Sequence, residues 1–200
     1  MSKPLEVDIF IPCFIDQVYP ETGFNMIKVL EKAGVKINYN PNQTCCGQIA
    51  FNAGFWDDAK KLGEKFIKDF DNGRMIVGPS ASCIGYVRNG FDELFYNGAY
   101  HNEYKQLQRS IFEITDFLVN VVKVTDLGSV FEHKVTFHDS CAALREYKLG
   151  NEPRILLKNV SGLELVEMEN CHECCGFGGT FAIKFEPIST AMAGDRKSVV

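Results

Sequence analysis

The stretch VDIFIPCFIDQVYPETGFNMIKVLEKAGVKINYN (residues 7–40) is the strongest indication of the fold. A short apolar, β-prone run at 7–12 is followed by a segment at 24–34 whose apolar residues recur at helical spacing and which ends in Gly34. Glycine commonly stands just beyond the last helical residue. A second β-prone run follows at 35–40. The stretch therefore predicts strand, helix, strand, the unit from which parallel sheets are built.

The same alternation continues downstream. Residues 55–73 predict an amphipathic helix, with Phe55, Ala59, Leu62, Phe66 and Phe70 at steps of three and four. Residues 74–78, RMIVG, then predict a buried strand. The segment 84–125 reads as helical, with one predicted apolar face made of Leu107, Ile111, Ile114, Leu118 and Val121. The fold class expected is α/β, with helices covering a parallel sheet.

The pattern then begins again in the last third of the chain. KVTFHDSC (134–141) predicts a strand that runs into a cysteine, EPRILLKNV (152–160) a helix, and LELVEME (163–169) a further strand. We therefore expect two Rossmann-like βαβ repeats with parallel sheets, related by internal duplication. The first repeat would occupy residues 1–100, a helical connection 101–132, and the second repeat 133–200.

The composition directs attention to the cysteines. The chain is 46% hydrophobic and 24% charged, and its net charge of −5 argues against a nucleic-acid backbone as its main partner. No secretory leader or membrane-spanning run is evident, so we expect a cytoplasmic protein. In a reducing compartment, clustered thiols point to metal binding or redox chemistry rather than to disulfides. The eight cysteines are Cys13, Cys45, Cys46, Cys83, Cys141, Cys171, Cys174 and Cys175.

The spacing of these cysteines repeats. Cys141 lies 128 residues after Cys13, and the doublet Cys174–Cys175 lies 129 residues after Cys45–Cys46. Each doublet is followed directly by a glycine. Such agreement indicates duplication. The counterpart of Cys83 would fall near position 212, beyond residue 200, so we expect the second repeat to lack its last strand and its last ligand.

Topology predicts that the first four cysteines meet. Cys13 follows the first expected strand, Cys45 and Cys46 follow the second, and Cys83 follows the third. The carboxyl ends of parallel strands share one edge of a sheet, where ligands collect. Four thiolates commonly hold a [4Fe–4S] cluster, and glycines beside them let the backbone approach it closely. Four thiolates also hold structural zinc, which stays open as an alternative.

Five segments carry a family resemblance. They are FIPCFIDQVYP (10–20), CCGQIAFNAG (45–54), GPSASCIGYVR (78–88), FHDSCAALREYKLGNEPRILL (137–157) and LELVEMENCHECCGFGGTFAIKF (163–185). In this order they resemble the CCG cysteine-rich domain family, which includes the cysteine-rich subunit of heterodisulfide reductase and the iron–sulfur subunit of glycolate oxidase. The motifs are most similar to the lactate utilization branch of that family.

The resemblance implies an iron–sulfur electron-transfer subunit of a complex that oxidises L-lactate to pyruvate, and thus an oxidoreductase subunit. Its implied partners are a ferredoxin-like iron–sulfur subunit and an accessory subunit. The alternative is a zinc-binding structural or assembly module of a related glycolate oxidase or heterodisulfide-reductase-like complex. The residues leave open which 2-hydroxy acid is oxidised.

The resemblance also implies two ligand sets. Site 1 is Cys13, Cys45, Cys46 and Cys83, for which we expect an ordinary [4Fe–4S] cluster. The noncubane cluster of the heterodisulfide branch needs a fifth cysteine, and Ser80 stands at that place. Site 2 is Cys141, Cys174 and Cys175, with Cys171 as a possible fourth ligand because it forms a Cys-x-x-Cys pair with Cys174.

Overall fold

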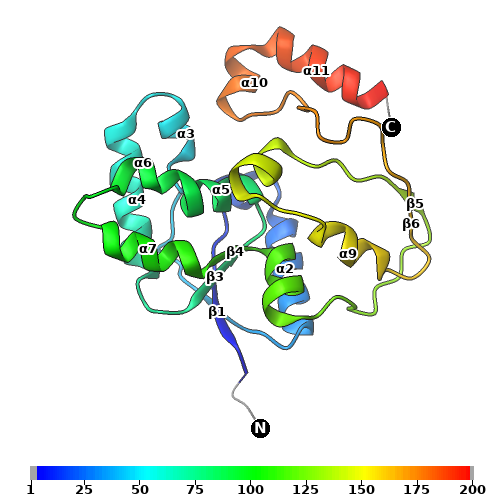
Figure 1. Cartoon of the computed structure of the whole chain (residues 1–200), viewed down its shortest axis with the longest axis horizontal. Coiled ribbons are helices and arrows are strands. Elements are labelled where there is room, and N and C mark those ends of the chain that lie inside the picture. The colour runs from blue at the N-terminus through cyan, green and yellow to red at the C-terminus, as the bar shows by residue number, and fades with distance from the viewer. Residues whose placement is uncertain (1–3, 199–200) are drawn as a thin grey trace.

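The computed structural model describes residues 4–198, and a four-stranded parallel sheet lies at its centre (Figure 1). The strand order is β2-β1-β3-β4. The strands are β1 (Glu6–Ile9), β2 (Lys36–Tyr39), β3 (Met75–Gly78) and β4 (Ile111–Glu113). The three strands expected at 7–12, 35–40 and 74–78 are present in shorter form. The expected α/β class with a parallel sheet is confirmed.

Helices cover both faces of this sheet (Figure 1). One face packs against α4 (Trp56–Phe70), α6 (Phe91–Phe95) and α7 (His101–Ser110), and the other against α2 (Pro20–Lys32), η2 (Phe117–Val122) and α9 (Glu152–Lys158). The helical segments up to residue 122 are α1 (Cys13–Val18), α2 (Pro20–Lys32), α3 (Gln48–Asn52), α4 (Trp56–Phe70), α5 (Ala81–Gly85), the π-helix η1 (Tyr86–Gly90), α6 (Phe91–Phe95), α7 (His101–Ser110), α8 (Ile114–Asp116) and the π-helix η2 (Phe117–Val122). Each face therefore has its own apolar cluster.

The alternation of side chains along β1 explains its central place. Val7 and Ile9 are fully buried in the cluster that contains α2, whereas Phe10 is fully buried in the cluster that contains α4. Successive strand residues point to opposite faces, so a strand that is apolar on both faces must lie inside the sheet. In the run VDIF, Val7 and Ile9 meet this condition on one face and Phe10 on the other, while Asp8 is a buried carboxylate.

One carboxylate ties the central strands together. Asp8 is 1% exposed, and its oxygens accept hydrogen bonds from Asn38 Nδ2 (2.6 Å), Asn72 Nδ2 (2.6 Å) and Arg74 Nε (2.7 Å). Asn38 belongs to β2, and the other two precede β3. Because a buried charge is stable only when it is paired and hydrogen-bonded, Asp8 links three strands in one register.

The segment 84–125 is not helical throughout, and its predicted single apolar face is wrong. Residues 111–113 form β4, which pairs with β3 in parallel register. Leu107 and Ile111 lie in the cluster on one face of the sheet, while Ile114, Leu118 and Val121 lie in the cluster on the other. At β4 the chain passes from one face of the sheet to the other. The helical spacing of three and four along the sequence therefore does not place these five residues on one face.

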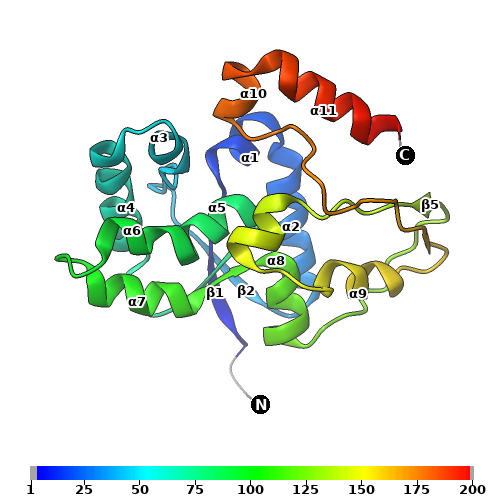
Figure 2. The ribbon, with the colours of Figure 1, turned by 45° about the horizontal axis from the view of Figure 1, so that its top comes forward.

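The second repeat is built on a smaller sheet. Strands β5 (Lys134–Val135) and β6 (Glu164–Leu165) pair in parallel. The helical segments are η3 (Ala142–Tyr147, a π-helix), α9 (Glu152–Lys158), α10 (Thr180–Lys184) and α11 (Glu186–Ser198). The expected strands at 134–141 and 163–169 are thus reduced to two residues each. Figure 2 shows α10 above α1, with β5 at the far edge of the molecule.

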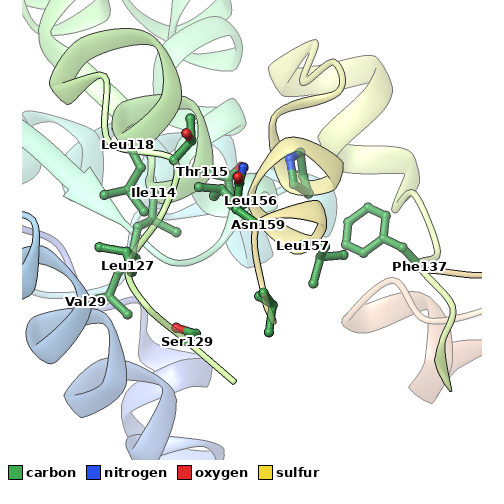
Figure 3. A pocket seen from close by; sticks show the side chains of 13 residues that line it. Val29, Ile114, Thr115, Leu118, Leu127, Ser129, Phe137, Leu156, Leu157 and Asn159 are labelled. Atoms are coloured by element: carbon green, nitrogen blue, oxygen red, sulfur yellow. The ribbon is translucent and has the colours of Figure 1, made fainter. Parts of the chain in front are cut away.

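The second repeat packs tightly on the first. A Cβ atom at Gly85 of α5 would lie 2.9 Å from the backbone nitrogen of Tyr147 in η3, so glycine permits this close approach. An apolar cavity of about 330 Å³ also lies between residues of the two halves. Figure 3 shows Val29 and Leu118 on one side of it and Leu157 and Phe137 on the other. Among residues 4–198, none of the helices combines the length and the apolar character that crossing a lipid bilayer requires.

Replacement of Asp8 by alanine is expected to lower the free energy of unfolding by about 3 kcal/mol, because two amides and one guanidinium lose their acceptor. Arg74 is 35% exposed and so recovers part of this loss by hydration. Asp58 pairs with Lys61 at the surface, with both side chains more than half exposed, and Asp58→Ala should cost less than about 1 kcal/mol. Urea unfolding measures both variants, and equal losses would contradict the role given to Asp8.

Candidate metal centre

The first cysteine set lies at the carboxyl edge of the central sheet. Cys13 begins α1 beyond β1, and Cys83 lies in α5 beyond β3. Strands β1 and β3 are neighbours, and β2 lies on the other side of β1. The chain leaves β1 toward β2 and leaves β3 toward β4, in opposite directions along the sheet. The position between β1 and β3 is therefore a switch point, where open parallel sheets bind ligands.

The four sulfur atoms of this set lie together. Cys13 Sγ donates to Cys45 Sγ at 3.5 Å. The Cys46 side chain, which is 2% exposed, lies close enough to the sulfurs of Cys45 and Cys83 to lower the pKa values of both. These contacts connect all four side chains, although 70 residues separate Cys13 from Cys83. The structure thus brings the four sequence-predicted residues of site 1 to one place.

The pKa values of the four thiols fall into two groups. Hydrogen bonds from Cys46, from the Gly47 N–H and from Cys13 lower the pKa of Cys45 to about 5. The Cys46 thiol likewise lowers the pKa of Cys83, which also receives a hydrogen bond from Ser80. Burial raises the pKa of Cys13 to about 11, and donation to Cys45 raises the pKa of Cys46 well above its ordinary value. The pKa values of Cys45 and Cys83 are thus lowered, and those of Cys13 and Cys46 are raised.

The glycine after each doublet has the same role in both repeats. Gly47 and Gly176 adopt φ values of +91° and +83°, a left-handed conformation that favours glycine. Their N–H groups approach Cys45 Sγ and Cys174 Sγ, each at 3.4 Å. A Cβ atom would lie 3.2 Å from the Ala59 carbonyl oxygen at Gly47 and 2.4 Å from that of Ser189 at Gly176. Glycine therefore lets α4 and α11 pack directly on the two doublets.

In the second set, Cys141 lies near the doublet Cys174–Cys175, and Cys171 contacts other groups. Burial raises the pKa of Cys141, and the nearby sulfurs of Cys174 and Cys175 raise it further. Cys171 instead lies 3.5 Å from Asp139 Oδ2 and 3.8 Å from Arg154 Nη2. Both Nη atoms of Arg154 donate to the Asp139 carboxylate at 2.7 Å.

Asp139, Cys171 and His172 also offer three ligand atoms within 4.8 Å of one another. The guanidinium of Arg154 already neutralises the Asp139 carboxylate in this group, which disfavours a second cation there. Cys171 therefore contacts an ion pair, whereas Cys174 and Cys175 lie near enough to Cys141 to raise its pKa.

The two cysteine sets adjoin each other. The rings of Phe14 and Phe177, which follow Cys13 and Cys175 closely in sequence, lie 5.5 Å apart. The carboxylate of Glu146 lies near both Cys83 and Cys141, since its charge contributes to the pKa values of both thiols. Glu146 also accepts a hydrogen bond from Gln48 Nε2 (3.1 Å). Sequence analysis missed Gln48 and Glu146, since their contact is between distant segments and no local motif marks either residue.

Comparisons with known proteins agree with this geometry. The model of the CCG cysteine-rich domain family matches residues 7–88 and 135–198. Lactate utilization protein A of Oceanobacillus iheyensis is 39% identical over 197 residues, which cover 98% of this chain and 80% of that protein. Lactate utilization protein A 2 of Bacillus cereus is 37% identical over 193 residues, with 96% and 80% covered. The chain therefore belongs to the CCG cysteine-rich domain family.

Proposed function

We propose that this chain is an iron–sulfur subunit that transfers electrons during the oxidation of L-lactate to pyruvate. The observation that carries the proposal is the meeting of Cys13, Cys45, Cys46 and Cys83 at the switch point of the sheet. The substrate comes from the relatives, which are named for lactate utilization.

The donor set fits a [4Fe–4S] cluster. Such clusters take four thiolates, and hydrogen bonds to their sulfurs tune the reduction potential. Site 1 supplies four thiols, the Gly47 N–H and the Ser80 hydroxyl, which lies close enough to Cys83 to lower its pKa. Because Ser80 stands where a fifth cysteine would be needed, we favour the ordinary cluster over the noncubane form.

When bound, the cluster would accept and release single electrons. The oxidation of L-lactate to pyruvate releases two electrons and two protons, so the electrons must pass on to a further carrier. We propose that a ferredoxin-like iron–sulfur subunit receives them in the cytoplasm, together with an accessory subunit of the same complex. The contribution of this chain is to hold the four sulfurs in place, with Cys46 buried among apolar side chains.

We further propose that Cys141, Cys174 and Cys175 bind part of a second centre. Its location beside site 1 would allow electrons to move between the two. Cys171 is the protein ligand that sequence analysis offers to complete it. The contact of Cys171 with Asp139 and Arg154 argues that this residue stays outside the coordination.

Purification without oxygen is expected to give a brown protein with about four iron and four acid-labile sulfide per cluster. Cys83→Ala should lower both contents by about one cluster, because site 1 loses a ligand. Ser80→Ala is the matched control, since it removes a hydrogen bond to Cys83 and should keep the iron. Iron, sulfide and zinc analysis with EPR measures all three proteins. A colourless protein with stoichiometric zinc, or Cys83→Ala with full iron, would contradict the proposal.

The role of Cys171 is tested by a pair of substitutions in the same loop. Cys174→Ser should lower the iron content, because Cys174 groups with Cys141. Cys171→Ser should leave the iron content and the EPR spectrum unchanged, because its sulfur contacts an ion pair instead. Equal losses of iron in the two variants would show that Cys171 is a ligand of the second centre.

A further inference from the structure

A polar cavity of about 320 Å³ lies where the second repeat packs on the first. Asp116 reaches it from just beyond the carboxyl end of β4, the edge strand of the central sheet. Arg88 and Asn89 line it from η1, and Tyr147 and Lys148 from the end of η3. None of the eight cysteines lines this cavity. It is therefore separate from the metal centres, although it opens at the same edge of the sheet.

Three π-helical segments converge on this cavity. Arg88 and Asn89 lie within η1, Asp116 directly precedes η2, and Tyr147 ends η3. π-helical turns are rare and occur frequently at functional sites. Lys148 follows η3 with a φ of +68°, a conformation that costs energy for any residue with a Cβ atom. Rare backbone conformations are thus concentrated around this polar cavity.

Arg88 is held rigidly in this cavity. Its guanidinium lies over the rings of Phe112 and Tyr147, at 5.5 and 5.0 Å from their centroids. Its Nη1 atom donates to the Tyr147 hydroxyl at 2.7 Å and to Asp116 at 3.4 Å. In the part of the chain that the structure describes, no hydrogen bond engages its Nε or Nη2. A fixed guanidinium with unused donors is prepared to bind an anion.

The acidic groups of the cavity already have partners. Asp116 accepts hydrogen bonds from Arg88, from the Tyr147 hydroxyl and from Asn120. Glu152 accepts hydrogen bonds from Asn120 Nδ2 (3.0 Å) and from the Gly150 N–H (2.7 Å). Lys148 has no ion pair within residues 4–198. The groups left to bind a ligand are therefore the donors of Arg88 and the ammonium of Lys148.

We propose that this cavity binds the carboxylate of a small organic acid between Arg88 and Lys148. The planar fork of arginine matches a carboxylate in a bidentate arrangement. A cavity of about 320 Å³ is near the lower end of the range for small-molecule sites, which suits an acid of a few carbons. The identification of that acid as a 2-hydroxy or 2-oxo acid, with L-lactate and pyruvate as the pair, rests on the proposed function.

Calorimetric titration of the intact chain with L-lactate and with pyruvate tests this proposal. The unmodified chain should bind one equivalent of at least one of the two acids. Lys148→Ala should weaken binding about tenfold, and Arg88→Gln about 10- to 100-fold, because each removes a charge-assisted contact. Lys123→Ala is the matched control, because Lys123 follows η2 with a φ of +62° and does not line the cavity. It should leave the affinity unchanged.

Arg88 packs between two rings, so Arg88→Gln is compared with the unmodified chain by thermal unfolding first. If that variant does not fold, the titration of Lys148→Ala decides the outcome, because Lys148 is exposed. Failure of the unmodified chain to bind either acid, or equal affinity in Lys148→Ala and Lys123→Ala, would overturn the proposal. Iron and sulfide analysis of the same samples tests the electron-transfer function separately, since the cavity contains no cysteine.

Discussion

Repulsion between four sulfur atoms gathered in one partly buried place constrains the whole molecule. Four thiolates this close together repel one another, so all four stay ionised only when a cation balances their charge. Cys13 donates a hydrogen bond to Cys45, and the Cys46 thiol lowers the pKa values of both Cys45 and Cys83. The parallel sheet imposes this gathering, since the carboxyl ends of β1, β2 and β3 share one edge. A metal cluster would remove this repulsion, because its positive charge would balance that of the four thiolates.

The two repeats share the same arrangement around the cysteine doublet, but the sheets that support it differ in size. In each, the N–H of a left-handed glycine approaches the first sulfur of the doublet, and a helix packs directly on that glycine. The first doublet is supported by the four-stranded sheet and two apolar clusters. The second is supported by two strands of two residues each, and by the ion pair between Asp139 and Arg154. Close packing of α5 on η3 then places the two cysteine sets side by side.

The sequence predicted those features that local patterns encode. Strands β1, β2 and β3 follow from short apolar runs, and the grouping of the first four cysteines follows from their places after three expected strands. The edge strand β4 was missed, because three residues between two helical segments continue a helical spacing by coincidence. The pairing of Cys171 with Asp139 and Arg154, and the cavity around Arg88, could not be predicted. They join residues up to 59 positions apart, such as Arg88 and Tyr147, by tertiary packing alone.

Diffraction from crystals of the anaerobically purified protein, recorded on both sides of the iron absorption edge, would show directly whether the four sulfurs hold iron. We expect anomalous density from a multi-iron group bonded to the sulfurs of Cys13, Cys45, Cys46 and Cys83. Density that appears only at the zinc edge, or an iron group that leaves Cys13 or Cys83 outside its coordination, would contradict this expectation.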